Sequence, residues 1–213
     1  MSVILSRLSG AFLLNCELFA LTLLFALPLG LVVAFGSMSR CKPLSGAVKT
    51  FVWVIRGTPL MLQLLFVYYG LPFIPGIGIR MDDFQAAIFA FVLNYAAYFC
   101  EIFRAGIQAI PKGQYEAART LGMNYVQTMR RIILPQVFRI ILPPVSNETI
   151  TLVKDTSLAF AIAYTEMFTM AKQIASAQAS LMPLFIAGLF YYIFNFVVAF
   201  VMEAIEKKLD YYR

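Results

Sequence analysis

Five long apolar stretches separated by short polar segments make up most of this 213-residue chain. A helix needs about 20 mainly apolar residues to cross about 30 Å of hydrocarbon. The stretches that reach this length cover residues 11–38, 48–72, 84–108, 144–170 and 183–205. A shorter amphipathic helix is expected over residues 123–142. The pattern therefore predicts an all-α integral membrane protein with about five transmembrane helices.

Prolines interrupt the first two of these stretches. Pro28 lies inside the first and Pro59 inside the second. Each proline lacks a backbone N–H donor, so one carbonyl of the helix loses its hydrogen bond. Neighbouring groups in a membrane protein can satisfy this carbonyl, and we therefore expect a kink and not the end of the helix at both prolines. Arg56, Gly57 and Thr58 precede Pro59. We interpret this segment as a structural pivot whose arginine extends toward the membrane interface.

The composition supports a membrane location for the whole chain. Hydrophobic residues make up 61% and charged residues 13%, and the mean hydropathy is +0.80. Soluble domains are about half apolar and a quarter charged. There is no room for a large soluble domain, so residues 1–213 are predicted to form a single transmembrane domain. The net charge of +6 is better explained by orientation in the bilayer than by nucleic-acid binding, because the basic residues flank the apolar stretches.

Most basic residues fall in segments that share one side of the predicted membrane domain. They are Arg40, Lys42, Lys49, Arg56, Arg104, Lys112, Arg119, Arg130, Arg131, Arg139, Lys207, Lys208 and Arg213. The opposite loops hold only Arg7, Arg80 and Lys172. Cytoplasmic loops are enriched in lysine and arginine. The N-terminus is therefore predicted outside and the C-terminus in the cytoplasm of a multi-pass protein of the cell membrane.

The residue types that the sequence lacks exclude several kinds of chemistry. There is no histidine, which excludes Ser-His-Asp and Cys-His catalysis and histidine-ligated metals. The three cysteines, Cys16, Cys41 and Cys100, have no paired spacing for zinc or a redox couple. No glycine-rich phosphate loop of the Walker type occurs, so this chain is not predicted to hydrolyse ATP itself.

The most polar stretch, about residues 109–123, follows the third apolar segment. Pro111 ends that segment, helix formers follow, and Gly122 is suited to a left-handed C-terminal cap. Glu116 falls in the first turn, where a carboxylate favours the helix dipole. Ala117 and Ala118 leave one side of this helix smooth enough to approach a groove on another protein. A solvated helical loop without a partner is the alternative.

The order of residues here resembles the membrane subunits of ATP-binding-cassette (ABC) importers. The matching segments are Glu116-Ala117-Ala118, Gly122 and Ile132-Ile133-Leu134-Pro135. Other segments are similar to the polar amino-acid branch of that family: Arg56-Gly57-Thr58-Pro59-Leu60, the run over residues 105–114, the run over residues 142–148, and Lys154-Asp155-Thr156-Ser157-Leu158. The pair Phe99-Cys100 departs from the small residue that commonly precedes the following glutamate in that branch.

The resemblance implies a type I ABC importer architecture, in which this chain is a permease subunit and not an enzyme. The coupling-helix loop, about residues 109–123, would dock on a cytoplasmic ABC ATPase dimer, and its contact residues would be Tyr115, Glu116, Ala117, Ala118 and Gly122. The ATPase would bind ATP and Mg, with no cofactor in this chain. Other implied partners are an extracellular or periplasmic solute-binding protein and a second permease subunit, either identical or a similar paralogue.

Charged residues inside the fourth apolar stretch are the candidates for a substrate site. At about 100° per residue, Glu148, Thr151, Asp155 and Glu166 share one stripe of a helix. Ionisable residues at membrane depth usually face a polar cavity, a partner charge or a substrate. We predict that Glu148, Thr151, Lys154 and Asp155 bind substrate, with Lys154 paired to a carboxylate elsewhere and Glu166 at the outer rim. An interhelical ion-pair network is the alternative.

Acidic side chains favour a cationic substrate. A basic amino acid such as arginine, lysine or histidine is therefore the first expectation, with glutamine as its main competitor. Polar residues in other stretches, Gln63, Asn94, Tyr98 and Asn195, are as suited to interhelical hydrogen bonds as to a ligand. An ion- or proton-coupled secondary amino-acid carrier that uses Glu148 and Asp155 as proton sites is the alternative function.

Overall fold

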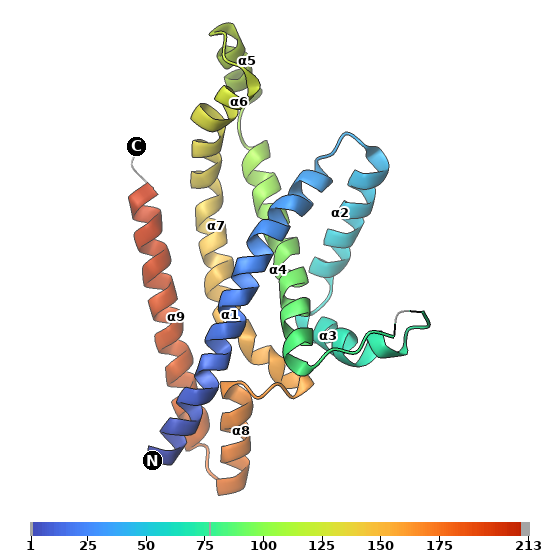
Figure 1. Ribbon diagram of the computed structural model, residues 1–213. Coiled ribbons are helices and arrows are strands. Elements are labelled where there is room, and N and C mark those ends of the chain that lie inside the picture. Colours follow the sequence, from blue (N-terminus) through green and yellow to red (C-terminus); the bar gives the residue numbers. More distant parts are fainter. Residues whose placement is uncertain (1, 77, 210–213) are drawn as a thin grey trace.

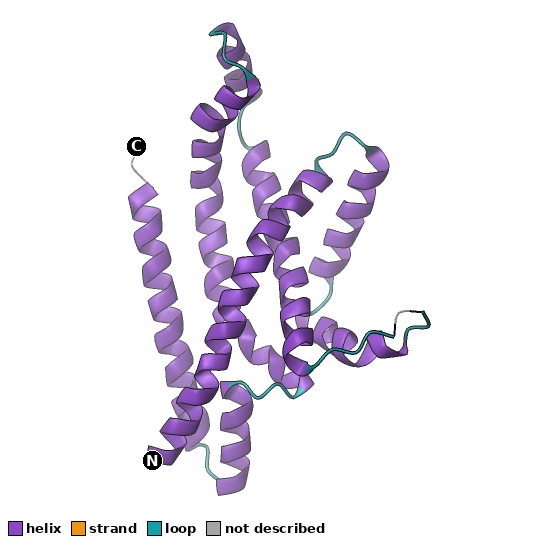
Figure 2. Ribbon diagram, in the orientation of Figure 1, coloured by secondary structure: helices purple, strands orange, loops and turns teal. Residues whose placement is uncertain are grey.

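The computed structural model describes residues 2–76 and 78–209, and every regular element in this part of the chain is helical (Figure 2). The elements in chain order are α1 (Ser2–Ser37), α2 (Lys42–Gly57), α3 (Leu60–Leu65), η1 (Phe66–Gly70), η2 (Leu71–Phe73), α4 (Asp83–Gln108), α5 (Lys112–Thr120), α6 (Tyr125–Thr128), η3 (Met129–Ile133), α7 (Leu134–Asp155), η4 (Thr156–Ile162), α8 (Met167–Gln178) and α9 (Met182–Leu209). Arg213, one of the basic residues predicted on the cytoplasmic side, lies outside the described residues.

The long helices run lengthwise through the molecule (Figure 1). Helix α1 begins at one end, whereas α9 finishes at the other, where α5 and the loop between α1 and α2 also lie. Within the described residues, α1, α4 and α9 are long and apolar enough to cross a membrane, and α2 with the segment 60–73 forms a fourth, bent candidate. Helix α7 runs beside them but is more polar, so a fifth crossing through α7 stays a prediction.

The predicted kink at Pro59 is confirmed. The change of direction there is so large that it breaks the helix in two. Helix α2 ends at Gly57, Thr58 is extended with ψ 143°, and the segment 60–73 that begins after Pro59 lies at an angle of 106° to α2. A residue before proline avoids the helical region because its backbone meets the proline ring. The expected uninterrupted helix 48–72 is therefore wrong. Pro28, in contrast, lies within the uninterrupted helix α1.

The predicted helices 123–142 and 144–170 are also wrong in their boundaries. Elements α6, η3 and α7 follow one another without a break from Tyr125 to Asp155, with Pro143 and Pro144 inside α7. The chain then tightens into the 3₁₀ helix η4, reaches the left-handed residue Ala163 (φ 61°) and starts α8 at Met167. The apolar residues after 155 thus belong to a turn and a separate helix.

Helix α4 is in close contact with both α1 and α7. A Cβ atom added at Gly30 of α1 would lie 2.8 Å from the Cβ atom of Phe99 and 3.0 Å from the carbonyl oxygen of Ala96 on α4. Two turns further along α4, a Cβ atom at Gly106 would lie 2.2 Å from the Cγ2 atom of Ile141 on α7. Small residues allow membrane helices to approach in this way. These contacts set the distance between the polar faces of α4 and α7.

Candidate functional site

A polar cavity of about 380 Å³ lies among the break between α2 and α3, the middle of α4, the end of α7 and the start of η4. Its lining residues are Thr58, Pro59, Leu60, Asn94, Tyr95, Tyr98, Glu148, Thr151, Asp155 and Leu158. Among the described residues, its wall has two carboxyl groups and no lysine or arginine. It is therefore an acidic site between three segments that are distant in sequence.

Asp155 is held in this cavity by a tyrosine from α4. The Tyr95 hydroxyl donates a hydrogen bond of 2.7 Å to Oδ2 of Asp155. The Tyr95 ring is buried and stacks parallel to the ring of Phe91, and the ring of Phe99 is tilted against it. Because the ring is fixed by packing, its hydroxyl fixes the carboxylate at the C-terminal end of α7.

The predicted substrate residues separate into two groups in the structure. Glu148, Thr151 and Asp155, spaced three and four residues apart on α7, share the cavity wall. Lys154 is exposed and does not line the cavity. A turn of about 100° per residue carries it off the face that its neighbour Asp155 presents. Lys154 also forms no ion pair among the described residues of this chain, so the partner carboxylate expected for it is not found here.

Gln63 stabilises the break beside the cavity. Its amide nitrogen donates to the carbonyl oxygens of Ile55 (2.7 Å) and Thr58 (3.1 Å) and to Oγ1 of Thr58 (2.8 Å), while its oxygen accepts from Nδ2 of Asn94 (3.0 Å). The last carbonyls of a helix have no partner within it. Gln63 thus caps α2 and connects it to α4. Sequence reasoning noted Gln63 and Asn94 but could not pair them.

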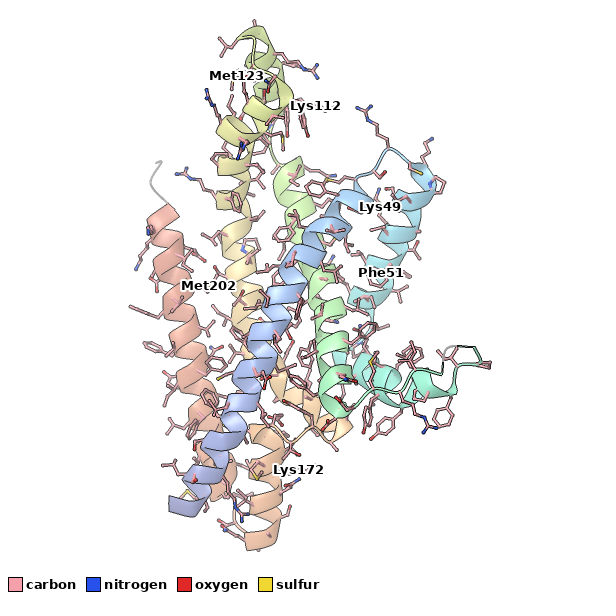
Figure 3. The ribbon with its side chains drawn as sticks, viewed as in Figure 1. Lys49, Phe51, Lys112, Met123, Lys172 and Met202 are labelled. Carbon is pink, nitrogen blue, oxygen red and sulfur yellow. The ribbon has the colours of Figure 1, made fainter. Side chains whose placement is uncertain are left out.

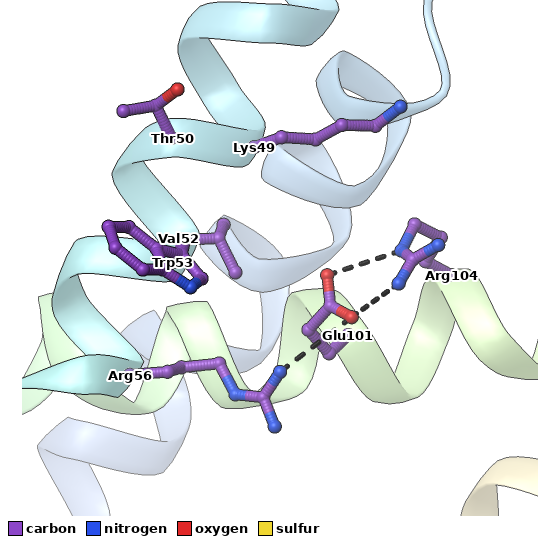
Figure 4. Close-up of a pocket in the computed structure, with 7 residues that line it drawn as sticks. All are labelled: Lys49, Thr50, Val52, Trp53, Arg56, Glu101 and Arg104. Carbon is purple, nitrogen blue, oxygen red and sulfur yellow. Dashed lines mark hydrogen bonds and ion pairs between the residues drawn. The ribbon is translucent and has the colours of Figure 1, made fainter.

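Arg56 points toward α4. Its Nη1 atom lies 3.7 Å from Oε2 of Glu101, and its guanidinium lies over the Tyr98 ring at 5.2 Å from the ring centre. Arg104 also pairs with Glu101, through Nη2 to Oε2 and through Nε to Oε1 at 3.2 Å (Figure 4). The segment predicted to be a pivot is therefore held against α4 by the ion pair of Arg56 with Glu101 and by the hydrogen bond of the Gln63 amide.

The position predicted for Glu166, at the outer rim on the stripe of Asp155, is wrong. Glu166 is 0% exposed and caps the N-terminus of α8, accepting from the N–H groups of Phe168 and Thr169 at 2.7 Å each. It also accepts from the Tyr191 hydroxyl (2.9 Å) and Nδ2 of Asn15 (3.2 Å). The positive end of the α8 dipole and these donors stabilise the buried group. Glu166 therefore joins α8 to α1 and α9.

Helix α5 forms the tip of the molecule, where Figure 3 labels Lys112 and Met123. It ends in the predicted left-handed cap, with Gly122 at φ 72°. The N–H of Gly122 donates to the carbonyl of Arg119 (2.9 Å), and the N–H of Met123 donates to that of Ala118 (3.0 Å). These bonds satisfy carbonyls that the last turn of a helix leaves open.

The two alanines of α5 have different surroundings. Ala117 and Glu116 are exposed, whereas Ala118 is 0% exposed, so the smooth alanine face predicted for docking is only half available. Tyr115 is half-buried, and burial raises the pKa of its phenol. The sequence reading missed the large exposed apolar side chains next to the cap, of which Leu121 is 78% exposed.

The side-chain amides of Gln114 and Gln136 join α5 to α7. Each amide donates to the oxygen of the other, at 2.9 Å and 2.6 Å, and Nε2 of Gln136 also donates to the carbonyl of Ile132 at 2.7 Å. This pair connects the exposed tip directly to the helix that ends at Asp155. The tip and the cavity are thus two ends of one continuous structural unit.

The arrangement of the helices is that of the membrane component of an ABC importer. Residues 26–211 match the family "Binding-protein-dependent transport system inner membrane component", and the chain belongs to this family. It is an amino-acid ABC transporter permease with the type I importer fold.

Characterised relatives narrow the class to amino-acid transport. The L-cystine permease TcyB of Bacillus subtilis is 40% identical over 207 residues, which cover 96% of this chain and 87% of TcyB. The arginine permease ArtQ of the same organism is 40% identical over 197 residues, covering 92% of this chain and 89% of ArtQ. The crystal structure of an amino acid ABC transporter with histidines contains a chain with a TM-score of 0.88 and 32% identity, with 98% of this chain and 96% of that chain covered.

Proposed function

We propose that this permease imports a basic amino acid, such as arginine, lysine or histidine, and that the cavity at Asp155 is its substrate site. One observation carries the proposal: Glu148 and Asp155 line the same cavity, and no basic residue of the described ranges 2–76 and 78–209 lines it with them. Two carboxylates in a partly desolvated cavity attract a cationic group. The relatives do not decide between substrates, because the cystine and arginine permeases are equally similar to this chain.

We place the energy source in a separate subunit. Helix α5 is exposed at the tip, matches the Glu-Ala-Ala loop of ABC permeases in sequence and lies at the same end as most basic residues. This supports docking of an ABC ATPase dimer, which would bind ATP and Mg, on the cytoplasmic side. The N-terminus would then face outward, where a solute-binding protein delivers the substrate.

One chain supplies half of the translocation path. A second permease subunit, identical or similar, would complete it around a two-fold axis. Differences between the ATP-bound and nucleotide-free ATPase would shift the population between outward-facing and inward-facing arrangements. The Gln114–Gln136 pair offers a route by which movement of α5 reaches α7 and Asp155.

Uptake into proteoliposomes tests this function. The permease is reconstituted alone, with its ATPase, and with both the ATPase and the binding protein, and uptake of radiolabelled L-arginine is measured with and without ATP. We expect uptake only in the complete, ATP-supplied system. Uptake by the permease alone that follows a proton or sodium gradient would instead establish the secondary-carrier alternative.

A further inference from the structure

A second polar pocket lies between α2 and α4 (Figure 4). It has a volume of about 570 Å³ and is lined by Lys49, Thr50, Val52, Trp53, Arg56, Glu101 and Arg104. Three of these side chains are cations and one is a carboxylate. Glu101 pairs with both Arg56 and Arg104, so a single negative charge is shared between two guanidinium groups. We call this site the basic pocket.

The charge of the basic pocket is unbalanced. Lys49 lines it, is exposed and forms no ion pair among the described residues. The side chains of Arg56 and Arg104 are 42% and 30% exposed, so their remaining donors are accessible from the pocket. Guanidinium groups bind carboxylates through paired N–H donors. The pocket therefore has the charge and the donors to receive an anion that lies outside the Glu101 network.

The basic pocket adjoins the acidic cavity. Tyr98 lines the cavity and carries the Arg56 guanidinium on its ring, while Arg56 lines the basic pocket. Tyr98 and Glu101 are three residues apart and occupy the same face of α4. Tyr95, which holds Asp155, and Glu101 are six residues apart, or about 9 Å along the helix and about 120° around it. An acidic site and a basic site thus follow one another along α4.

This succession of charges matches a particular kind of amino acid. The α-ammonium and α-carboxylate groups are attached to the same carbon and are too close together to occupy both sites. A long side chain that ends in a cation separates that charge from the carboxylate by several bonds. Glutamine has the length but no distal cation for Glu148 and Asp155.

We infer that the basic pocket is a carboxylate-binding subsite, in which Lys49, Arg56 and Arg104 hold the α-carboxylate of an amino acid whose distal cation lies at Asp155 and Glu148. The inference rests on the proposed function and extends it to a substrate class, amino acids with a long cationic side chain. The two subsites orient the substrate along α4, with its carboxylate toward the end of the molecule that carries α5.

Lys49 offers the clearest test, because it makes no ion pair with the part of the chain that the structure describes, so its replacement should leave the fold intact. Binding of L-arginine and of agmatine is measured by calorimetry on the permease–ATPase complex in phosphatidylcholine nanodiscs, without the binding protein. Agmatine keeps the guanidinium and lacks the carboxylate. We expect the wild type to prefer L-arginine, and Lys49→Gln to weaken L-arginine binding about two- to fivefold while agmatine binding is unchanged. Lys42→Gln, at an exposed position of the same helix outside the pocket, should change neither.

Several outcomes would overturn the inference. Equal changes for both ligands in Lys49→Gln, or none, would mean that no carboxylate lies in the basic pocket. Tighter wild-type binding of L-glutamine than of L-arginine would contradict the distal cation. An effect of Lys49→Gln that occurs only when phosphatidylglycerol is added would assign the pocket to a lipid phosphate.

The acidic site is tested separately in the same assay. Asp155→Asn should weaken both L-arginine and agmatine, because it removes the partner of the guanidinium that they share. If Asp155→Asn changes neither ligand while Lys49→Gln still affects L-arginine alone, the proposed substrate site fails together with the position of the distal cation, and only the contact between the carboxylate and the basic pocket stands. If the wild type binds neither ligand, both are wrong.

Discussion

Replacement of Asp155 by asparagine tests the acidic cavity without changing its shape. Asparagine has the same size as aspartate, and its side-chain oxygen can still accept the hydrogen bond that the Tyr95 hydroxyl donates at 2.7 Å. The substitution therefore removes the negative charge and leaves the contact between α4 and α7 in place. What changes is the attraction of the cavity for a cation.

The size of the effect follows from the interaction that is lost. A hydrogen bond to a charged partner contributes about 1.5–3 kcal/mol, which corresponds to roughly 10- to 150-fold in affinity. Glu148 remains in the cavity wall and supplies part of the attraction, so we expect the lower half of this range. The loss should apply to L-arginine and L-lysine much more than to a neutral amino acid.

The assay compares transport with folding in the same preparations. ATP-driven uptake of L-arginine and substrate-stimulated ATPase activity are measured in proteoliposomes beside the yield and thermal stability of the complex. Glu203→Gln, which removes one exposed carboxylate of α9 outside the cavity, is the matched control. We expect uptake to fall about tenfold or more with stability unchanged. A parallel loss of uptake and stability would show that Asp155 serves the fold and would refute the assignment.

Three other substitutions test the coupling helix and the packing. Glu116→Lys reverses an exposed charge on α5 and should abolish copurification of the ATPase while the permease stays folded, whereas Glu203→Lys on α9 should have no effect; unchanged binding would contradict docking at α5. Glu166→Ala removes the acceptor of the Phe168 and Thr169 N–H groups. It should lower the free energy of unfolding by about 2–4 kcal/mol in thermal or denaturant unfolding. A loss of less than about 1 kcal/mol would mean that other groups satisfy these donors. Gly106→Ala places a methyl group against Ile141 and should destabilise the contact between α4 and α7 by about 1–3 kcal/mol, whereas Gly188→Ala, which meets nothing within 4 Å, should be neutral; equal stability of the two variants would contradict the packing.

Local chemistry made several features of this protein readable from the sequence. The break at Pro59 depends on proline and the residue before it, and the left-handed cap at Gly122 depends on glycine and the end of one helix. The spacing of Glu148, Thr151 and Asp155 within one helix also placed them on a common face. Such features involve neighbours within about one or two turns, so a single sequence contains all the information that they require.

Contacts between distant segments decided the rest. Helical periodicity extended the stripe of Asp155 to Glu166, but α7 ends at Asp155, and Glu166 instead caps α8 and accepts hydrogen bonds from Asn15 and Tyr191. The pairing of Gln63 with Asn94 and of Arg56 with Glu101 depends on how α2, α3 and α4 pack. Sequence thus specified which polar groups enter the membrane domain, and only the tertiary structure determined their partners, because each pair joins helices whose approach is set by packing of the whole bundle.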